Sequence, residues 1–153
     1  MLKKLFFITS LIIFTELTVF AEITPLNITP AEIISTKKDQ IKVGDYLKFK
    51  AVSNVYMDGE LIIKKDTLIE GLVDFVHPNG WFADYAIIKL DTFSVTDENN
   101  NKMTINSPLT INGASDDLNN IQMFFDEILS YTSKGKEIHI TPGSKIFTLF
   151  INQ

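Results

Sequence analysis

The sequence predicts an all-β, mainly antiparallel domain, built as a small closed or partly open β-barrel, with a β-sandwich as the alternative. Apolar and polar residues alternate with a period of two from Val43 onward, a pattern typical of strands with one buried face. The connections between these segments are short and contain turn dipeptides, so neighbouring strands are expected to pair antiparallel. One segment departs from the alternation, and its apolar spacing is helical.

The first clear strand alternates Leu47, Phe49 and Ala51 with lysines. Asp58-Gly59 follows it, a dipeptide that suits the two positive φ angles of a type I′ hairpin turn. We expect this turn to join the first strand to a second one over residues 61–63.

Further turns and strands follow at short intervals. A turn at residues 64–66 leads into a strand over 68–76, and Asn79-Gly80 predicts another turn. Residues 81–95 are expected to form one long strand or a bent pair, and residues 102–111 a further strand. The residues expected to share one face of the long strand are Ala86, Ile88 and Leu90.

The exception lies at residues 116–132, where the apolar residues have the three-and-four spacing of one helical face. They are Leu118, Ile121, Phe124, Phe125, Ile128 and Leu129. Oxygen-bearing side chains at Ser115, Asp116 and Asp117 suit the start of a helix, and Gly135 suits its exit. The helix either caps one end of the sheet core or inserts into a partner groove or membrane surface. Its acidic polar face argues against anionic lipid.

Residues 1–21 have the layout of a cleaved secretory signal peptide, with two early lysines, an apolar stretch over residues 5–14, and Ala21 ending a cleavage motif. Glu16 argues against the alternative, a membrane anchor, because a charge near the middle of a bilayer costs about 3 kcal/mol. The predicted mature chain is an acidic domain, exported to the periplasm or secreted. It has no later segment suited to a membrane-spanning helix.

The mature chain divides into two parts. Residues 22–42 contain two prolines and a charged run, so we expect an extended lead-in, with a short strand at 31–35. Residues 43–153 are expected to form the barrel domain that carries the helical insert.

Composition excludes several kinds of function. The chain has no cysteine, so disulfides and thiolate chemistry are absent. All 14 basic residues are lysine, and the formal charge is −5. Without the guanidinium forks that read bases and phosphates, and with a net negative charge, no nucleic-acid partner is expected.

Two segments are similar to each other. Residues 60–69 can be laid over residues 137–146 with a constant offset of 77, and each predicts a strand, a tight turn, a hydroxyl residue (Thr67 or Ser144) and a second strand. A hydroxyl after a turn can hydrogen-bond the turn backbone. The similarity arises either by internal duplication, which would suggest a barrel with pseudo-twofold symmetry, or by chance, since short hairpins look alike.

A longer pattern runs through residues 35–151 and consists of KVGD at 42–45, FKAV at 49–52, DG at 58–59, IKKDT at 63–67, GLV at 71–73 and ITPGS at 140–144. It resembles a loose class of uncharacterised exported bacterial β-domains, and is similar to the β-barrel of type IV secretion core-complex proteins, which build envelope assemblies and are not enzymes. The chain departs from the class at Asp66, where glycine is usual. The resemblance implies a fold and a compartment, and it carries over no catalytic residues.

The residues that could carry chemistry form no recognisable motif. His77 and His139 have no second ligand at metal-binding spacing, and no serine lies in a nucleophile-elbow pattern. The oxygen-rich loop at 97–101 lacks the ligand order of a known calcium loop. We therefore predict no catalytic, cofactor-binding or metal-ligating residues, and no cofactor.

An aromatic cluster, Trp81, Phe82 and Tyr85, is the candidate binding patch, because aromatic faces bury a large area at little entropic cost. The alternative is a strand start that anchors the core.

The expected function is a non-catalytic module of the bacterial envelope that binds a partner protein or takes part in an assembly. The alternative is a carboxylate-dependent hydrolase acting on cell-wall or extracellular polymers. An enzyme would need a concave pocket with two carboxylates, whereas a module would expose an apolar patch.

Overall fold

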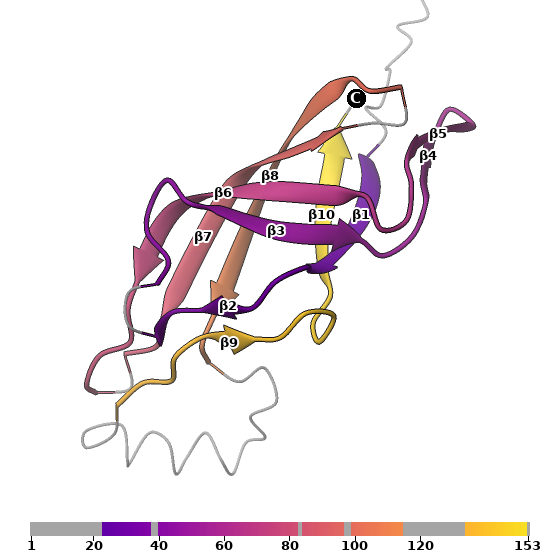
Figure 1. Ribbon diagram of the computed structural model, residues 1–153. Helices are drawn as coiled ribbons and strands as arrows, with labels where there is room; N and C mark the ends of the chain where they lie inside the picture. The colour runs from indigo at the N-terminus through magenta and orange to yellow at the C-terminus, as the bar shows by residue number, and fades with distance from the viewer. Residues whose placement is uncertain (1–22, 38–39, 83, 97–98, 115–133, 153) are drawn as a thin grey trace, which may run out of the picture.

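The computed structural model describes residues 23–37, 40–82, 84–96, 99–114 and 134–152, and within them the protein consists of strands and their connections (Figure 1). The strands, in chain order, are β1 (Ile23–Pro30), β2 (Ile34–Ser35), β3 (Tyr46–Ala51), β4 (Val55–Met57), β5 (Glu60–Ile63), β6 (Leu68–His77), β7 (Ile87–Thr96), β8 (Lys102–Asn112), β9 (His139–Ile140) and β10 (Phe147–Asn152). No α-helix occurs in these ranges. The predicted helix at 116–132 and the predicted signal peptide at 1–21 lie outside the described residues.

Six strands form one antiparallel sheet in the order β10-β1-β3-β6-β7-β8. The sheet curls until its two edge strands, β8 and β10, come into contact, which makes a nearly closed barrel (Figure 1). This confirms the predicted all-β barrel. Two small ribbons, β2 with β9 and β4 with β5, extend the ends of the barrel strands.

The edge strands meet at a seam that has a side-chain bond instead of a continuous ladder. The backbone N–H of Phe150 in β10 donates to the hydroxyl of Ser107 in β8, at 3.0 Å. Ser107 is buried, and the next residue is Pro108. Proline cannot donate to a ladder and is confined to edge strands and bulges, so its place in β8 agrees with the register shift opposite it between Leu90 and Thr92.

The core fills the barrel with the alternate side chains that the sequence predicted. Leu47, Phe49 and Ala51 are buried, and so are the predicted inward residues of β7 and its approach, which are Ala86, Ile88 and Leu90. Phe49 lies near the centre, with its ring edge-on to Phe93 at 6.0 Å and to Phe147 at 6.2 Å between centroids. Such edge-to-face pairs add to the stabilisation that burial provides.

Three expectations about the strands need correction. The 22–42 segment, expected as a lead-in outside the barrel domain, supplies β1, an internal strand whose Leu26 and Ile28 are fully buried. Asp58-Gly59 forms the expected turn, with φ of 49° and 81°, but it joins β4 to β5 instead of continuing β3. Residues 81, 82 and 84–86 do not extend β7, which begins at Ile87.

Candidate functional site

The candidate patch lies in the connection between β6 and β7. Trp81 and Phe82 are 68% and 71% exposed, while Tyr85 is half-buried. The structure therefore separates the three predicted residues: two aromatic side chains face solvent, and the third packs partly against the protein. Ala86, one residue further on, is the first fully buried side chain of this stretch and starts the core contact.

Hydrogen bonds tie this loop to the segment that precedes β9. The N–H of Gly80 donates to the carbonyl of Asp84, and the N–H of Gly135 donates to the carbonyl of Gly80, both at 2.8 Å. The side-chain amide of Asn79 donates to the carbonyl of Gly135 at 2.6 Å. The two bonds to Gly135 join residues more than 50 positions apart in the sequence, so they hold the backbone at Asn79 and Gly80 in place.

The same two segments are joined directly at the aromatic residues. Trp81 forms an isolated antiparallel bridge with Lys134, and the N–H of Ala86 donates to the carbonyl of Lys136 at 3.2 Å. Phe82 has a φ of 63°, in the left-handed region. A bulky residue in that region costs about 1–2 kcal/mol and persists only where the surroundings hold it. The braced backbone therefore keeps a strained, exposed aromatic residue in place.

His77, at the end of β6, also contacts this loop. Its Nε2 atom lies 2.8 and 2.9 Å from the two carboxylate oxygens of Asp84. The side chains are 40% and 47% exposed, so solvent screens the pair and its contribution to stability is small. The sequence did not indicate this pair, because Asp84 lies seven residues beyond His77, outside the short spacings typical of metal ligands.

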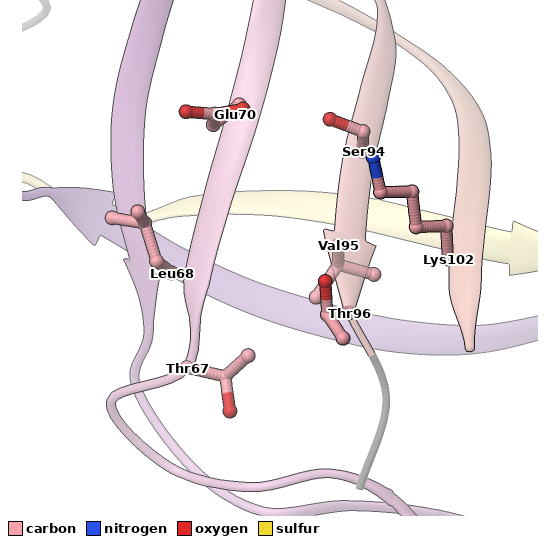
Figure 2. Close-up of a pocket in the computed structure, with 7 residues that line it drawn as sticks. All are labelled: Thr67, Leu68, Glu70, Ser94, Val95, Thr96 and Lys102. Atoms are coloured by element: carbon pink, nitrogen blue, oxygen red, sulfur yellow. The ribbon is translucent and has the colours of Figure 1, made fainter. Parts of the chain in front are cut away.

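Two grooves of the described surface each contain one carboxylate, fewer than the two that a carboxylate-dependent hydrolase needs. One groove, of about 360 Å³, lies on the outer face of β6, β7 and β8, and Glu70 is the one carboxylate among its lining residues (Figure 2). Its lining residues are Thr67, Leu68, Glu70, Ser94, Val95, Thr96 and Lys102. Another groove, of about 460 Å³, lies beside β2 and β9 and contains Glu137 and His139.

A second groove, of about 300 Å³ between β2 and β3, contains two carboxylates, Glu32 and Asp45. Both accept backbone hydrogen bonds. The N–H of Lys48 donates to Oε1 of Glu32 at 3.2 Å, and the N–H of Lys42 donates to Oδ2 of Asp45 at 2.7 Å. Their local role is to fix the chain around β3.

Among the described residues, no three histidine, cysteine, aspartate or glutamate side chains lie close enough together to hold a metal ion. His139 is exposed in β9, away from the His77–Asp84 pair. Part of the 97–101 loop, the weak calcium candidate, lies outside the described ranges. No helix within these ranges is long and apolar enough to cross a membrane.

Comparison of the chain with protein-family models, with curated proteins and with solved structures gave no match. The resemblance to exported envelope β-domains therefore stays a prediction from the sequence pattern.

Proposed function

We propose that this protein is an exported, non-catalytic module of the bacterial envelope, which binds a partner protein or joins an assembly through Trp81 and Phe82. The observation that carries the proposal is the pairing of two strongly exposed aromatic side chains with a braced backbone that holds Phe82 in a strained conformation. Surfaces that expose large aromatic residues on a fixed backbone suit recognition, because little entropy is lost when they are buried.

The size of the patch sets what the partner must do. Aromatic side chains bury about 150–250 Å² each, so covering Trp81 and Phe82 removes about 200–350 Å² from water. At about 25 cal/mol per Å², this is about 5–9 kcal/mol of gross gain, comparable to the cost of association. A stable complex therefore needs contacts beyond the two aromatics. The His77–Asp84 pair, which contacts the same loop, and Lys134, which forms the bridge with Trp81, are polar groups that can supply them.

Export is the second part of the proposal. It is supported by the signal-peptide layout of residues 1–21 and by the likeness of the sequence pattern to exported β-domains. The periplasm and the extracellular space are both compatible with it. The hydrolase alternative would place its site in the groove between β2 and β3, where Glu32 and Asp45 each accept a hydrogen bond from a backbone N–H.

Site-specific photo-crosslinking in the bacterium that encodes the protein tests the proposal. A photoreactive amino acid replaces Phe82 in the full chain, and a matched control places it at Ile146, which is apolar and 59% exposed before β10. We expect a reproducible protein adduct from position 82 that is absent from position 146 and is lost when Trp81→Ser is added. Absence of any adduct, or the same adducts at both positions, would contradict the proposed binding surface.

A further inference from the structure

We infer that the barrel contains two copies of one structural unit, and that the rest of the chain is inserted at the tip of one copy. Unit 1 consists of β1 and β2 together with β9 and β10. Unit 2 is the continuous run β3-β4-β5-β6. This inference concerns the architecture of the barrel and is independent of the proposed partner binding.

The two units follow the same path. In each, a barrel strand leads into one strand of a small ribbon, and the other ribbon strand passes through a tight turn into a second barrel strand. That second barrel strand pairs antiparallel with the first, β10 with β1 and β6 with β3. The two units meet where β1 pairs antiparallel with β3, as expected for an approximate twofold relation (Figure 1).

The ribbons pair at equivalent residues. Ile34 of β2 is opposite Ile140 of β9, and Val55 of β4 is opposite Ile63 of β5. Ile34 and Val55 lie 21 positions apart. Ile63 and Ile140 lie 77 positions apart, which is the offset between the two similar segments of the sequence.

The tight turns of the two units contain the same backbone hydrogen bond. The N–H of Thr67 donates to the carbonyl of Lys64 at 3.1 Å, and the N–H of Ser144 donates to the carbonyl of Thr141 at 3.2 Å. The hydroxyl of Ser144 also donates to the Thr141 carbonyl at 2.8 Å, as predicted for a hydroxyl after a turn. Both donor and acceptor in unit 1 therefore lie 77 positions beyond their counterparts in unit 2.

The third residue of each turn is left-handed and contacts the same point of its unit. Asp66 has a φ of 67° and donates its N–H to the carbonyl of Ala51, the last residue of β3. Gly143 has a φ of 73° and donates to the carbonyl of Pro30, the last residue of β1. Pro30 and Ala51 are again 21 positions apart.

Beyond the turns, the correspondence continues with one extra residue in unit 1. Phe147 pairs with Ile28, and Ile69 pairs with Phe49, so the offset between the second strands becomes 78. The sequence overlay therefore holds through Ser144 and is wrong beyond it, where it matched the buried Ile69 with the exposed Ile146. The matched buried pairs of the two units are Leu26 with Leu47, Ile28 with Phe49, Ile34 with Val55, Phe147 with Ile69, and Ile151 with Val73.

Chance similarity between two hairpins explains only the tight turns. It does not explain why the strands that precede the ribbons keep a second constant offset, nor why each turn bonds the equivalent last residue of its barrel strand. Duplication of one unit explains all these features together.

The nesting of the units has a consequence for the chain. The tip of unit 2 is the Asp58-Gly59 turn. At the equivalent place in unit 1 the chain leaves after β2, builds β3 to β8, and returns at β9. The ribbon tip is thus a position at which the unit accommodates a long insertion. The loop with Trp81 and Phe82 belongs to the inserted part that has no counterpart in either unit.

An insertion experiment in the full chain tests the inference. A flexible Gly/Ser segment of about 20 residues is placed between Asp58 and Gly59, and the same segment is placed between Lys65 and Asp66 as the matched control. Long insertions at a tolerant turn cost little, so we expect the first variant to unfold cooperatively with a Tm less than about 10 °C below that of the unmodified chain. The control breaks the two hydrogen bonds that hold the tight turn, so its Tm should be at least about 10 °C lower again.

The inference is overturned if the Asp58–Gly59 variant does not fold, or if the two variants tolerate the insertion equally. Circular dichroism gives the Tm and shows whether the strand content is retained.

Discussion

Gly71 in β6 gives the sharpest test of the packing. A Cβ at this position would lie 2.6 Å from Cε1 of Phe93 and 2.7 Å from Cδ2 of Leu90. Carbon atoms normally pack at about 3.5–4.0 Å, so these side chains would have to move by about 1 Å. The Phe93 ring has little room to do so, because it already packs edge-on against Phe49.

We therefore expect Gly71→Ala to destabilise the protein. Overpacking a core costs about 1–3 kcal/mol, and restricting the unfolded chain offsets about 0.4–1 kcal/mol of this. The net loss is about 1–2 kcal/mol, which corresponds to a decrease in Tm of about 3–8 °C.

Denaturant unfolding of the single and double mutants provides the assay. Phe93→Leu shortens the side chain that the new methyl group meets, so the double mutant should be more stable than the sum of the two single effects by about 1 kcal/mol. An unchanged free energy of unfolding for Gly71→Ala, or strictly additive effects of the two substitutions, would contradict the tight contact of Gly71 with Phe93 and Leu90.

Four further outcomes are expected. Ser107→Ala leaves the Phe150 amide without its acceptor at the seam, which should cost about 1–2 kcal/mol and speed exchange of that amide in NMR; slow exchange would contradict this. Leu26→Ala removes a fully buried β1 side chain and should lower the free energy of unfolding in urea by about 2–5 kcal/mol. A loss well below this would contradict the place of β1 in the core. Asp66→Gly should stabilise by about 1 kcal/mol because the position is left-handed, and a lower denaturation midpoint would refute this. Trp81 is the only tryptophan, so its fluorescence should be that of a water-exposed indole with ready quenching by acrylamide, and a buried-type spectrum would reject the patch.

The alternation of apolar residues was sufficient to predict the strands that need only one buried face. β3 and β8 follow this rule closely, because period-two patterning is a local property of the chain. In β7 the buried positions shift by one after Leu90, at the irregularity in its pairing with β8. β1 was missed as a barrel strand since Pro25 and Pro30 suggest a lead-in, and its partners β3 and β10 are known only from the fold.

The site was harder to predict than the fold. The sequence identified Trp81 and Phe82 as a cluster, but it could not show that they are exposed. That outcome depends on bonds to Gly135 and on the bridge to Lys134, both distant in the sequence. These contacts have no local signature, and they accompany a stretch, residues 81, 82 and 84–86, that lies outside β7.

The pairing of β1 with β10 also governs when the protein can assemble. Ile23 is opposite Asn152 and Ile28 is opposite Phe147, so the first and last strands depend on each other. Contacts between such distant residues are slow to form, because a long loop must close first. β1 therefore cannot form this pairing until Phe147–Asn152, more than 110 residues further along the chain, has been synthesised. The sheet thus closes at β1 only after all the other barrel strands have been made, so the order of synthesis leaves this pairing until late.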